Sequence, residues 1–108
     1  MFGDIMGMMG KLKEAQKKIE ETKKRLDSVY VTGTADGEKV KVTMSVNREV
    51  KDIYIDPSLE GDLEQISDLM VIAMNQGLKK ANDIQEAELG AAAKEGMPNI
   101  PGMENLMR

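Results

Sequence analysis

Apolar side chains recur every seven residues across residues 4–28, and this repeat constrains the fold more than any other feature of the chain. Position a of the repeat holds Ile5, Leu12, Ile19 and Leu26, and position d holds Met8, Ala15, Thr22 and Val29. An apolar seam at a and d is typical of a helix that packs along another helix. At 1.5 Å per residue the predicted helix is ~37 Å long. The fold must therefore supply a helical partner for a long, narrow seam.

The charged residues of this helix are sorted by heptad position. Most acidic residues are at b and c, namely Glu14, Glu20, Glu21 and Asp27, with Lys13 and Asp4 as exceptions. Positions e, f and g hold Lys11, Lys17, Lys18, Lys23, Lys24 and Arg25. We interpret this as one basic flank and one acidic flank, and a segregated basic flank is a candidate phosphate-binding surface. The alternative is a solvated surface stabilised by the i,i+4 pairs Glu14–Lys18, Glu20–Lys24 and Glu21–Arg25.

Three short segments after residue 28 have the composition and alternation of β-strands. Residues 29–34 are rich in β-branched side chains, residues 40–46 alternate apolar with polar side chains, and residues 50–56 direct Ile53 and Ile55 inward. Turn-forming stretches at 35–38 and 47–49 separate the segments. Such short connections predict a three-stranded antiparallel meander with one face covered and one available.

A second long helix is predicted after Asp62, to about residue 94. Pro57 ends the sheet because it cannot donate to a strand ladder, and Asp62 with Gln65 resembles a capping box. The apolar seam, widened early by Leu69 and Met74, consists of Leu63, Ile66, Met70, Ala73, Gly77, Ile84 and Ala87. We therefore expect an α+β fold, an α-β-β-β-α subunit with the meander flanked by two long helices. We also expect residues 1–95 to form one domain and the Gly- and Pro-punctuated residues 96–108 to form a flexible C-terminal tail.

Charge is unevenly distributed along a chain whose formal net charge is −4. Residues 1–28 contain seven basic and five acidic side chains, whereas residues 56–95 contain three basic and nine acidic ones. Binding to a polyanion depends on local potential within ~8–10 Å, so the bulk charge does not exclude nucleic acid. The absence of Cys suits a reducing cytoplasm. Neither an apolar stretch of ~18 residues nor a secretory signal is evident, so we expect no membrane partner.

Catalytic and metal-binding residue types are scarce. His and Cys are absent, and the glycines match no nucleotide-binding loop. We expect no enzyme, cofactor or small-molecule substrate. The segment Asp56, Ser58, Glu60 and Gly61 resembles the start of a calcium-binding EF loop, but its twelfth position is Ser67 and not Glu. Helix capping is the favoured interpretation, so we expect no metal site.

Several segments together resemble the YbaB/EbfC family of bacterial nucleoid-associated proteins over nearly the whole chain. They are residues 1–3, 13–17, the hairpin 31–43, Ile55-Asp56-Pro57-Ser58-Leu59, residues 68–75, and the glycine and proline positions of residues 96–102. Two departures are a turn at residues 36–39 where the family often has a run of glycines, and Gly77 where a helix former is usual. Gly77 is expected to loosen the second helix by up to ~1 kcal/mol.

The resemblance implies a homodimer with projecting helical arms that binds duplex DNA with little sequence preference. It assigns the DNA contacts to the basic residues of the first helix, and to Lys79 and Lys80 as a smaller basic spot on the second. A Met-rich core with only three aromatic residues also favours an oligomer. We expect a cytoplasmic, nucleoid-associated bacterial protein that contacts DNA mainly through phosphates.

The alternative function belongs to another class of protein. Two coiled helices flanking β-structure also resemble a prefoldin-like subunit, which suggests a protein-binding holdase or adaptor with no nucleic-acid role. A holdase needs exposed apolar helix tips, which residues 5–9 could supply, whereas a DNA binder needs the lysines. Stacking of single-stranded bases is less favoured because no aromatic residue is placed for it.

Overall fold

The computed structural model describes residues 2–96 of the chain, and side chains for residues 5–95. It confirms the α-β-β-β-α order and the α+β class. The remainder of the expected flexible tail, residues 97–108, lies outside the described residues. The elements are α1 (Phe2–Leu26), β1 (Tyr30–Ala35), β2 (Val40–Ser45), β3 (Val50–Ile55), a 3-10 helix η1 (Pro57–Leu59) and α2 (Leu63–Gly96).

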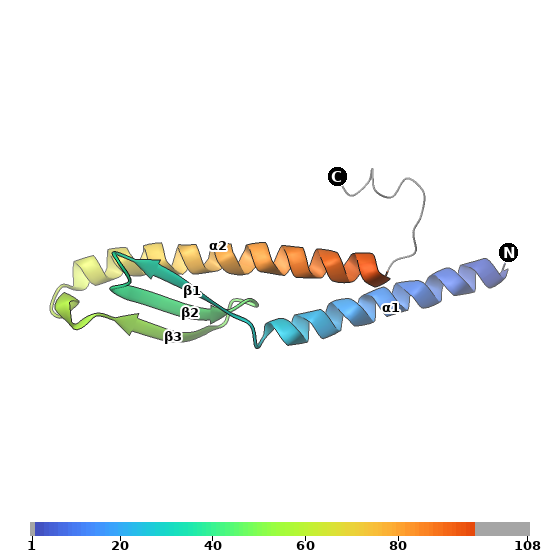
Figure 1. Cartoon of the computed structure of the whole chain (residues 1–108), viewed down its shortest axis with the longest axis horizontal. Coiled ribbons are helices and arrows are strands. Elements are labelled where there is room, and N and C mark those ends of the chain that lie inside the picture. The colour runs from blue at the N-terminus through green and yellow to red at the C-terminus, as the bar shows by residue number, and fades with distance from the viewer. Residues whose placement is uncertain (1, 97–108) are drawn as a thin grey trace.

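The molecule is elongated, with principal extents of 71 × 26 × 16 Å. Helix α2 runs along most of its length, with the sheet beside its first half and α1 beside its second half (Figure 1). The two helices are antiparallel, and α1 extends beyond the C-terminal end of α2. The expected helix–helix packing is thus present for only part of α1. No helix within residues 2–96 is long and apolar enough to cross a membrane.

The sheet is the predicted antiparallel meander, with strand order β1-β2-β3. Gly33 pairs with Val42, and Val42 pairs with Ile53, so these three residues form one row across the sheet. The β2–β3 ladder is irregular between Thr43 and Met44, where Lys51 is the extra residue. The register places the apolar side chains of all three strands on one face.

Helix α2 covers that apolar face over β1 and β2, where the core forms. Val40, Val42 and Met44 of β2 are fully buried, and Leu26 at the end of α1 and Ala73 of α2 join the same cluster. Strand β3 is different. The prediction that Ile53 and Ile55 point inward is correct for the face but wrong for burial, because these side chains remain 47% and 38% exposed.

Close packing of α2 on β1 depends on two glycines. A Cβ built on Gly33 would lie 1.9 Å from the carbonyl oxygen of Ala73 and 2.6 Å from the backbone nitrogen of Gly77. A Cβ on Gly77 would meet the Met44 methyl carbon at 2.7 Å. The expectation that Gly77 only loosens α2 was therefore incomplete, because Gly77 lies at the point of closest approach between helix and strand.

The predicted seam of α2 needs two corrections. Leu63 is 78% exposed, and Ala87 is exposed as well, because the sheet and α1 reach neither side chain. Ala81, which the seam omitted, is fully buried. The beginning of α2 follows the prediction, since the Asp62 carboxylate accepts a hydrogen bond from the Gln65 backbone N–H at 3.1 Å.

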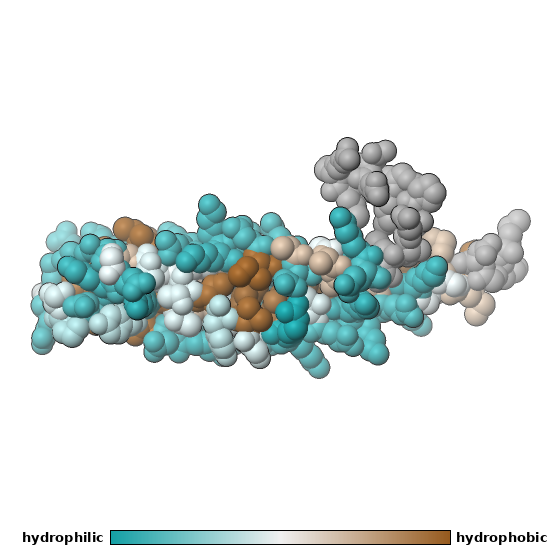
Figure 2. All heavy atoms as spheres, viewed as in Figure 1, coloured by the Kyte–Doolittle hydropathy of each residue, from teal (hydrophilic) through white to brown (hydrophobic). Residues whose placement is uncertain are grey.

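One face of the molecule, seen in the space-filling view, is mainly hydrophilic. Figure 2 shows one larger hydrophobic area on this face, midway along the molecule where α2 passes the junction of α1 with the sheet. Paler hydrophobic atoms also follow α1 toward its N-terminal end. The strongly apolar surface is therefore local on this side.

Candidate nucleic-acid interface

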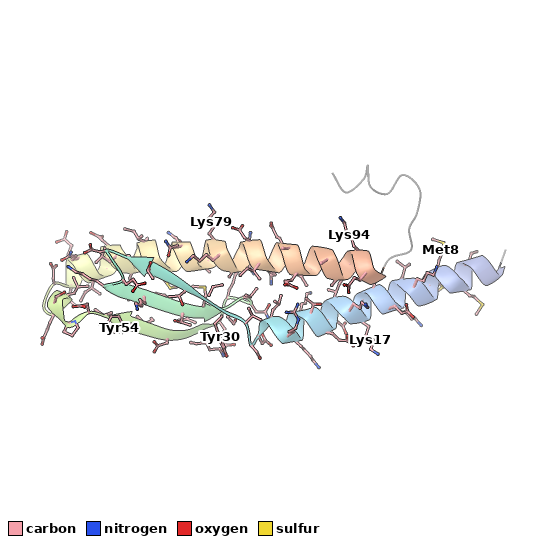
Figure 3. All side chains as sticks on the ribbon, in the orientation of Figure 1. Met8, Lys17, Tyr30, Tyr54, Lys79 and Lys94 are labelled. Carbon is pink, nitrogen blue, oxygen red and sulfur yellow. The ribbon has the colours of Figure 1, made fainter. Side chains whose placement is uncertain are left out.

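The eight basic residues proposed from the sequence do not form one surface. Six lie on α1 and two on α2. In Figure 3, Lys17 projects from α1 on the side away from α2, whereas Lys79 projects from α2 on the side away from α1. Basic groups therefore project from opposite sides of the molecule, Lys17 from α1 and Lys79 from the stretch of α2 that runs beside the sheet.

Two of the six α1 residues face α2 and are already paired. Lys18 Nζ lies 3.2 Å from the Glu95 carboxylate, and Arg25 Nη2 lies 2.6 Å from the Glu88 carboxylate. The expected i,i+4 partners Glu14 and Glu21 are not used. A shallow polar cleft between the helices is lined by Lys18, Glu21, Thr22, Arg25 and Glu95. Because it presents both signs of charge, this cleft does not select a polyanion.

The interpretation of e, f and g as a single basic flank was wrong. Successive residues are about 100° apart on a helix, so e and g lie on opposite sides of the a/d seam. Position g turns Lys18 and Arg25 toward α2, and position f turns Lys17 and Lys24 outward. Sequence reasoning also set Lys13 aside, although its spacing of four residues from Lys17 places it on the same outward face.

Lys13, Lys17 and Lys24 form what we call the outward row. All three side chains are exposed. Among the described side chains, of residues 5–95, no carboxylate lies within ion-pair distance of any of them. The row spans ~17 Å of helix at 1.5 Å per residue. Its positive charge is available to an external anion, as is that of Lys11 and Lys23, which are exposed and absent from the ion pairs among the described side chains.

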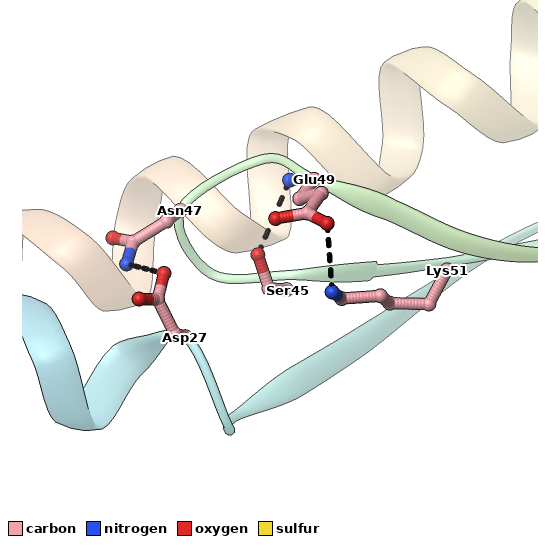
Figure 4. Close-up of polar contacts among 5 residues, drawn as sticks. All are labelled: Asp27, Ser45, Asn47, Glu49 and Lys51. Carbon is pink, nitrogen blue, oxygen red and sulfur yellow. Dashed lines mark hydrogen bonds and ion pairs between the residues drawn. The ribbon is translucent and has the colours of Figure 1, made fainter.

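The C-terminal end of α1 is fixed to the sheet by a polar junction. The Asn47 side-chain amide donates to the Asp27 carboxylate at 2.5 Å (Figure 4). It also donates to the carbonyl oxygen of Lys23 at 2.8 Å. Arg48, in the same turn, donates to Asn82 at 2.9 Å and Gln85 at 2.7 Å on α2. Lys23 therefore lies at the joint, and its charge also favours the negative end of the α1 dipole.

The two α2 residues also differ from each other. Lys80 Nζ donates to the backbone carbonyl of Thr32 on β1 at 2.9 Å, so its ammonium group is bound to the sheet edge. Lys79 points outward, and Lys94 projects from the same helix on the same side (Figure 3). The sequence analysis did not include Lys94 among the candidate DNA-binding residues. Its only link to Lys79 is that both side chains lie on the outer face of α2.

The acidic loop after β3 serves as a cap. The Asp56 carboxylate accepts a hydrogen bond from the Ser58 backbone N–H at 2.8 Å, and this bond lowers the pKa of Asp56 below 3.8. This geometry agrees with the helix-capping interpretation. Within the described part of the chain, no group of three or more Asp and Glu side chains is arranged to hold a metal ion.

Lys51 also has a shifted pKa, and it too lies away from the outward row. Its hydrogen bond to Glu49, at 2.8 Å, raises the pKa above 10.5 (Figure 4). The Glu49 backbone N–H in turn donates to Ser45 Oγ at 3.1 Å. These contacts order the β2–β3 turn, and the lysine is charged at neutral pH.

Comparison with known proteins places this geometry in a family. The chain is 50% identical to a nucleoid-associated protein of Flavobacterium johnsoniae over 97% of its own length and 99% of that protein. It is 39% identical to a nucleoid-associated protein of Rhizobium meliloti, covering 94% and 95% of the two chains. A crystal structure of an uncharacterized protein from Helicobacter pylori shares the fold, with a TM-score of 0.67 and 24% identity over 72% of this chain and 84% of that one. The YbaB/EbfC DNA-binding family matches residues 1–97, and the chain belongs to that family.

Proposed function

We propose that this protein is a bacterial nucleoid-associated protein of the cytoplasm that binds duplex DNA as a homodimer, mainly through backbone phosphates and with little sequence preference. Membership of a DNA-binding family supports the ligand class. The observation that carries the phosphate-contact proposal is the outward row, whose three side chains are exposed and whose Lys17 projects away from α2 (Figure 3). No catalytic step, cofactor, small-molecule substrate or membrane contact forms part of this proposal.

Electrostatics supply the mechanism. A lysine that neutralises a phosphate releases a condensed counterion, so affinity falls as salt rises. The outward row gains most from this exchange, because its lysines give up no ion pair among the described side chains. Lys18 and Arg25 must first leave Glu95 and Glu88. We therefore assign the principal phosphate contacts to Lys13, Lys17 and Lys24, with Lys79 and Lys94 as a second set.

The homodimer is supported by an apolar surface that one subunit leaves uncovered, which we call the β3 face. It combines side chains of β3 with those on one side of α2. This is the side of α2 that carries Asn82 and Gln85, which accept hydrogen bonds from Arg48 in the β2–β3 turn. The β3 face consists of Val50, Ile53 and Ile55 of β3 and Val71 and Leu78 of α2. Each of these side chains is at least 36% exposed. Monomeric soluble proteins rarely expose large contiguous apolar patches. We propose that a second copy covers this face.

A protein-binding function is the second candidate. The exposed side chains of Ile5, Met8 and Leu12, between 45% and 57% accessible, are the feature that favours it. Short apolar strips of this kind bind amphipathic partners. A holdase of this type needs no lysine contacts, so measurements on the outward row distinguish the two functions.

The deciding experiment is a fluorescence-anisotropy titration of a labelled duplex at several salt concentrations. If about four to six phosphates are neutralised per dimer, log K should fall against log salt with a slope near −4 to −5. Replacing Lys13, Lys17 and Lys24 by Gln should remove most of this slope and weaken binding strongly at physiological salt, and the remaining slope should come from Lys79 and Lys94. Changing these exposed side chains should leave the fold intact, as circular dichroism can verify.

The matched control replaces three lysines elsewhere. Lys39, Lys41 and Lys51 are paired with Asp36, Glu38 and Glu49 on the sheet, so their change to Gln alters net charge equally. We expect this variant to retain most of the parent slope. A folded outward-row variant with an unchanged slope would refute the assigned contacts. A parent protein without affinity for DNA at low salt would favour the protein-binding function.

A further inference from the structure

Two carboxylates of α2 bind basic side chains of α1 in a repeated arrangement. Glu88 and Glu95 are seven residues apart on α2, and their partners Arg25 and Lys18 are seven residues apart on α1. Seven residues are nearly two helical turns, or ~10.5 Å, so each set lies along one side of its helix. Because the helices are antiparallel (Figure 1), the two spacings match and both ion pairs form together. The acidic residues of α2 thus neutralise two of the basic residues of α1.

The two ion pairs are accessible to an external anion. Their four side chains are between 42% and 66% exposed, and exposed pairs of this kind change an equilibrium constant by about fivefold at most. Apolar packing holds the helices together independently of them. Ala15 and Ala92, each one turn from a residue of the Lys18–Glu95 pair, are 5% and 6% exposed. Lys18 and Arg25 can therefore exchange partners while the helices stay packed.

We propose that Glu95 and Glu88 compete with DNA phosphates for Lys18 and Arg25, and thereby lower the affinity of the protein for duplex DNA. This inference rests on the proposed function and adds to it an inhibitory contact within the chain. Carboxylate and phosphate oxygens both accept charge-assisted hydrogen bonds from Lys and Arg, so one can replace the other.

The outward row brings the competing phosphates close to these pairs. Lys17 directly precedes Lys18 in the sequence, and Lys24 directly precedes Arg25. A duplex bound by the outward row carries one negative charge per ~1.7 Å of its axis, so phosphates are present at high local density beside the cleft. Lys18 and Arg25 then become additional DNA contacts, but only after they leave their carboxylates.

The variant that carries both Glu88→Gln and Glu95→Gln tests this competition in the anisotropy titration at low salt. Gln keeps the size of the side chain and removes its charge, so both basic groups are released. We expect the dissociation constant for duplex DNA to fall about fivefold, or roughly twofold for each pair. Thermal unfolding followed by circular dichroism verifies that the helices remain packed.

Two comparisons separate the release of the basic groups from a general effect of charge. In a protein that already carries Lys18→Gln and Arg25→Gln, no basic group is left to release. The two Glu substitutions should then change the dissociation constant by less than about twofold. The charge control replaces Glu60 and Glu64 by Gln in the parent. Both residues are exposed, form no ion pair among the described side chains and lie near the opposite end of α2 from Glu95, so we expect an equally small change.

The outcomes distinguish this inference from the proposed function. If the parent binds DNA and the Glu88→Gln, Glu95→Gln variant binds no more tightly than the charge control, the competition is refuted and the proposed function stands. An equal gain in the protein without Lys18 and Arg25 would also refute it, because the carboxylates would then repel DNA directly. If neither the parent nor this variant binds DNA at low salt, both proposals fail. Binding that appears only after the two Glu substitutions would support the competition.

Discussion

Helix α2 binds the backbone of one edge strand of the sheet, β1, but leaves the other edge strand, β3, uncovered. At the β1 edge, Gln76 Oε1 accepts a hydrogen bond from the Thr34 backbone N–H at 2.7 Å, and Lys80 donates to the Thr32 carbonyl at 2.9 Å. Backbone groups that a neighbouring strand would otherwise pair are thus occupied by α2 side chains. At the β3 edge, no strand pairs with β3 on its outer side within the described residues, and the apolar side chains beside it are exposed.

The row Gly33–Val42–Ile53 explains this asymmetry. Gly33 has no side chain, so the backbone of α2 can approach β1 directly, whereas Ile53 at the other end of the row would hold a helix away. Helix α2 therefore covers β1 and β2 and leaves β3 uncovered. Edge strands are normally protected against pairing with other chains. Protection of β1 alone directs any association of subunits toward β3.

The largest expected effect concerns the residue that draws α2 onto β1. Gly33→Ala places a methyl group against the backbone of Ala73 and Gly77, where no side chain can move aside. We expect a loss of about 3 kcal/mol in the free energy of unfolding, at the upper end for overpacking. Gly77→Ala is the control. Its methyl group meets the flexible tip of Met44, and the gain of up to ~1 kcal/mol in helix propensity offsets that strain.

Urea denaturation followed by circular dichroism measures both variants. If Gly33→Ala were as stable as the parent, the close approach of α2 to β1 would not hold the helix in place. The explanation of the uncovered β3 face would then be wrong.

The next effect concerns association through the β3 face. Ile53→Lys puts a charge at the centre of this face, and we expect the dimer dissociation constant to rise about 30-fold, or ~2 kcal/mol. Ile72→Lys is the matched control. Ile72 is 55% exposed, but it precedes Gln76 by one helical turn and so lies on the flank near β1.

Sedimentation velocity over a concentration series reports the two constants. We expect Ile72→Lys to associate like the parent. Equal weakening by both substitutions would show that general surface charge, and not the β3 face, controls association. A parent protein that remains monomeric at micromolar concentration would remove the homodimer from the proposed function.

Much of the fold could be predicted from local patterns in the sequence. Heptad spacing identified α1, alternation identified the strands, and Asp62 with Gln65 identified the start of α2. Each of these signals arises within a few residues or turns, where backbone geometry alone relates the side chains. The burial of Leu26 and Ala15 followed from the same periodicity.

The relations between distant segments could not be obtained in this way. Nothing local shows that Gly33 and Gly77 touch, or that Gln76 and Lys80 bind the edge of β1. The same holds for Lys18 and Arg25, whose partners on α2 are 77 and 63 residues away. For the candidate site this separation mattered most. Which lysines remain available for phosphate depends on where α2 packs, and the outward row became recognisable only with that helix in place.

The smallest expected effect tests the protection of the β1 edge. Gln76→Leu removes the acceptor for the Thr34 N–H, and we expect a loss of about 1 kcal/mol in the free energy of unfolding. Gln76→Glu is the control, because a carboxylate oxygen can accept the same hydrogen bond. The unpaired N–H also makes β1 available to other chains, so the Leu variant should form species larger than a dimer at high concentration. Light scattering would detect them. If Gln76→Leu and Gln76→Glu behaved alike in both measurements, α2 would not be the element that blocks this edge. The restriction of subunit association to β3 would then require another cause.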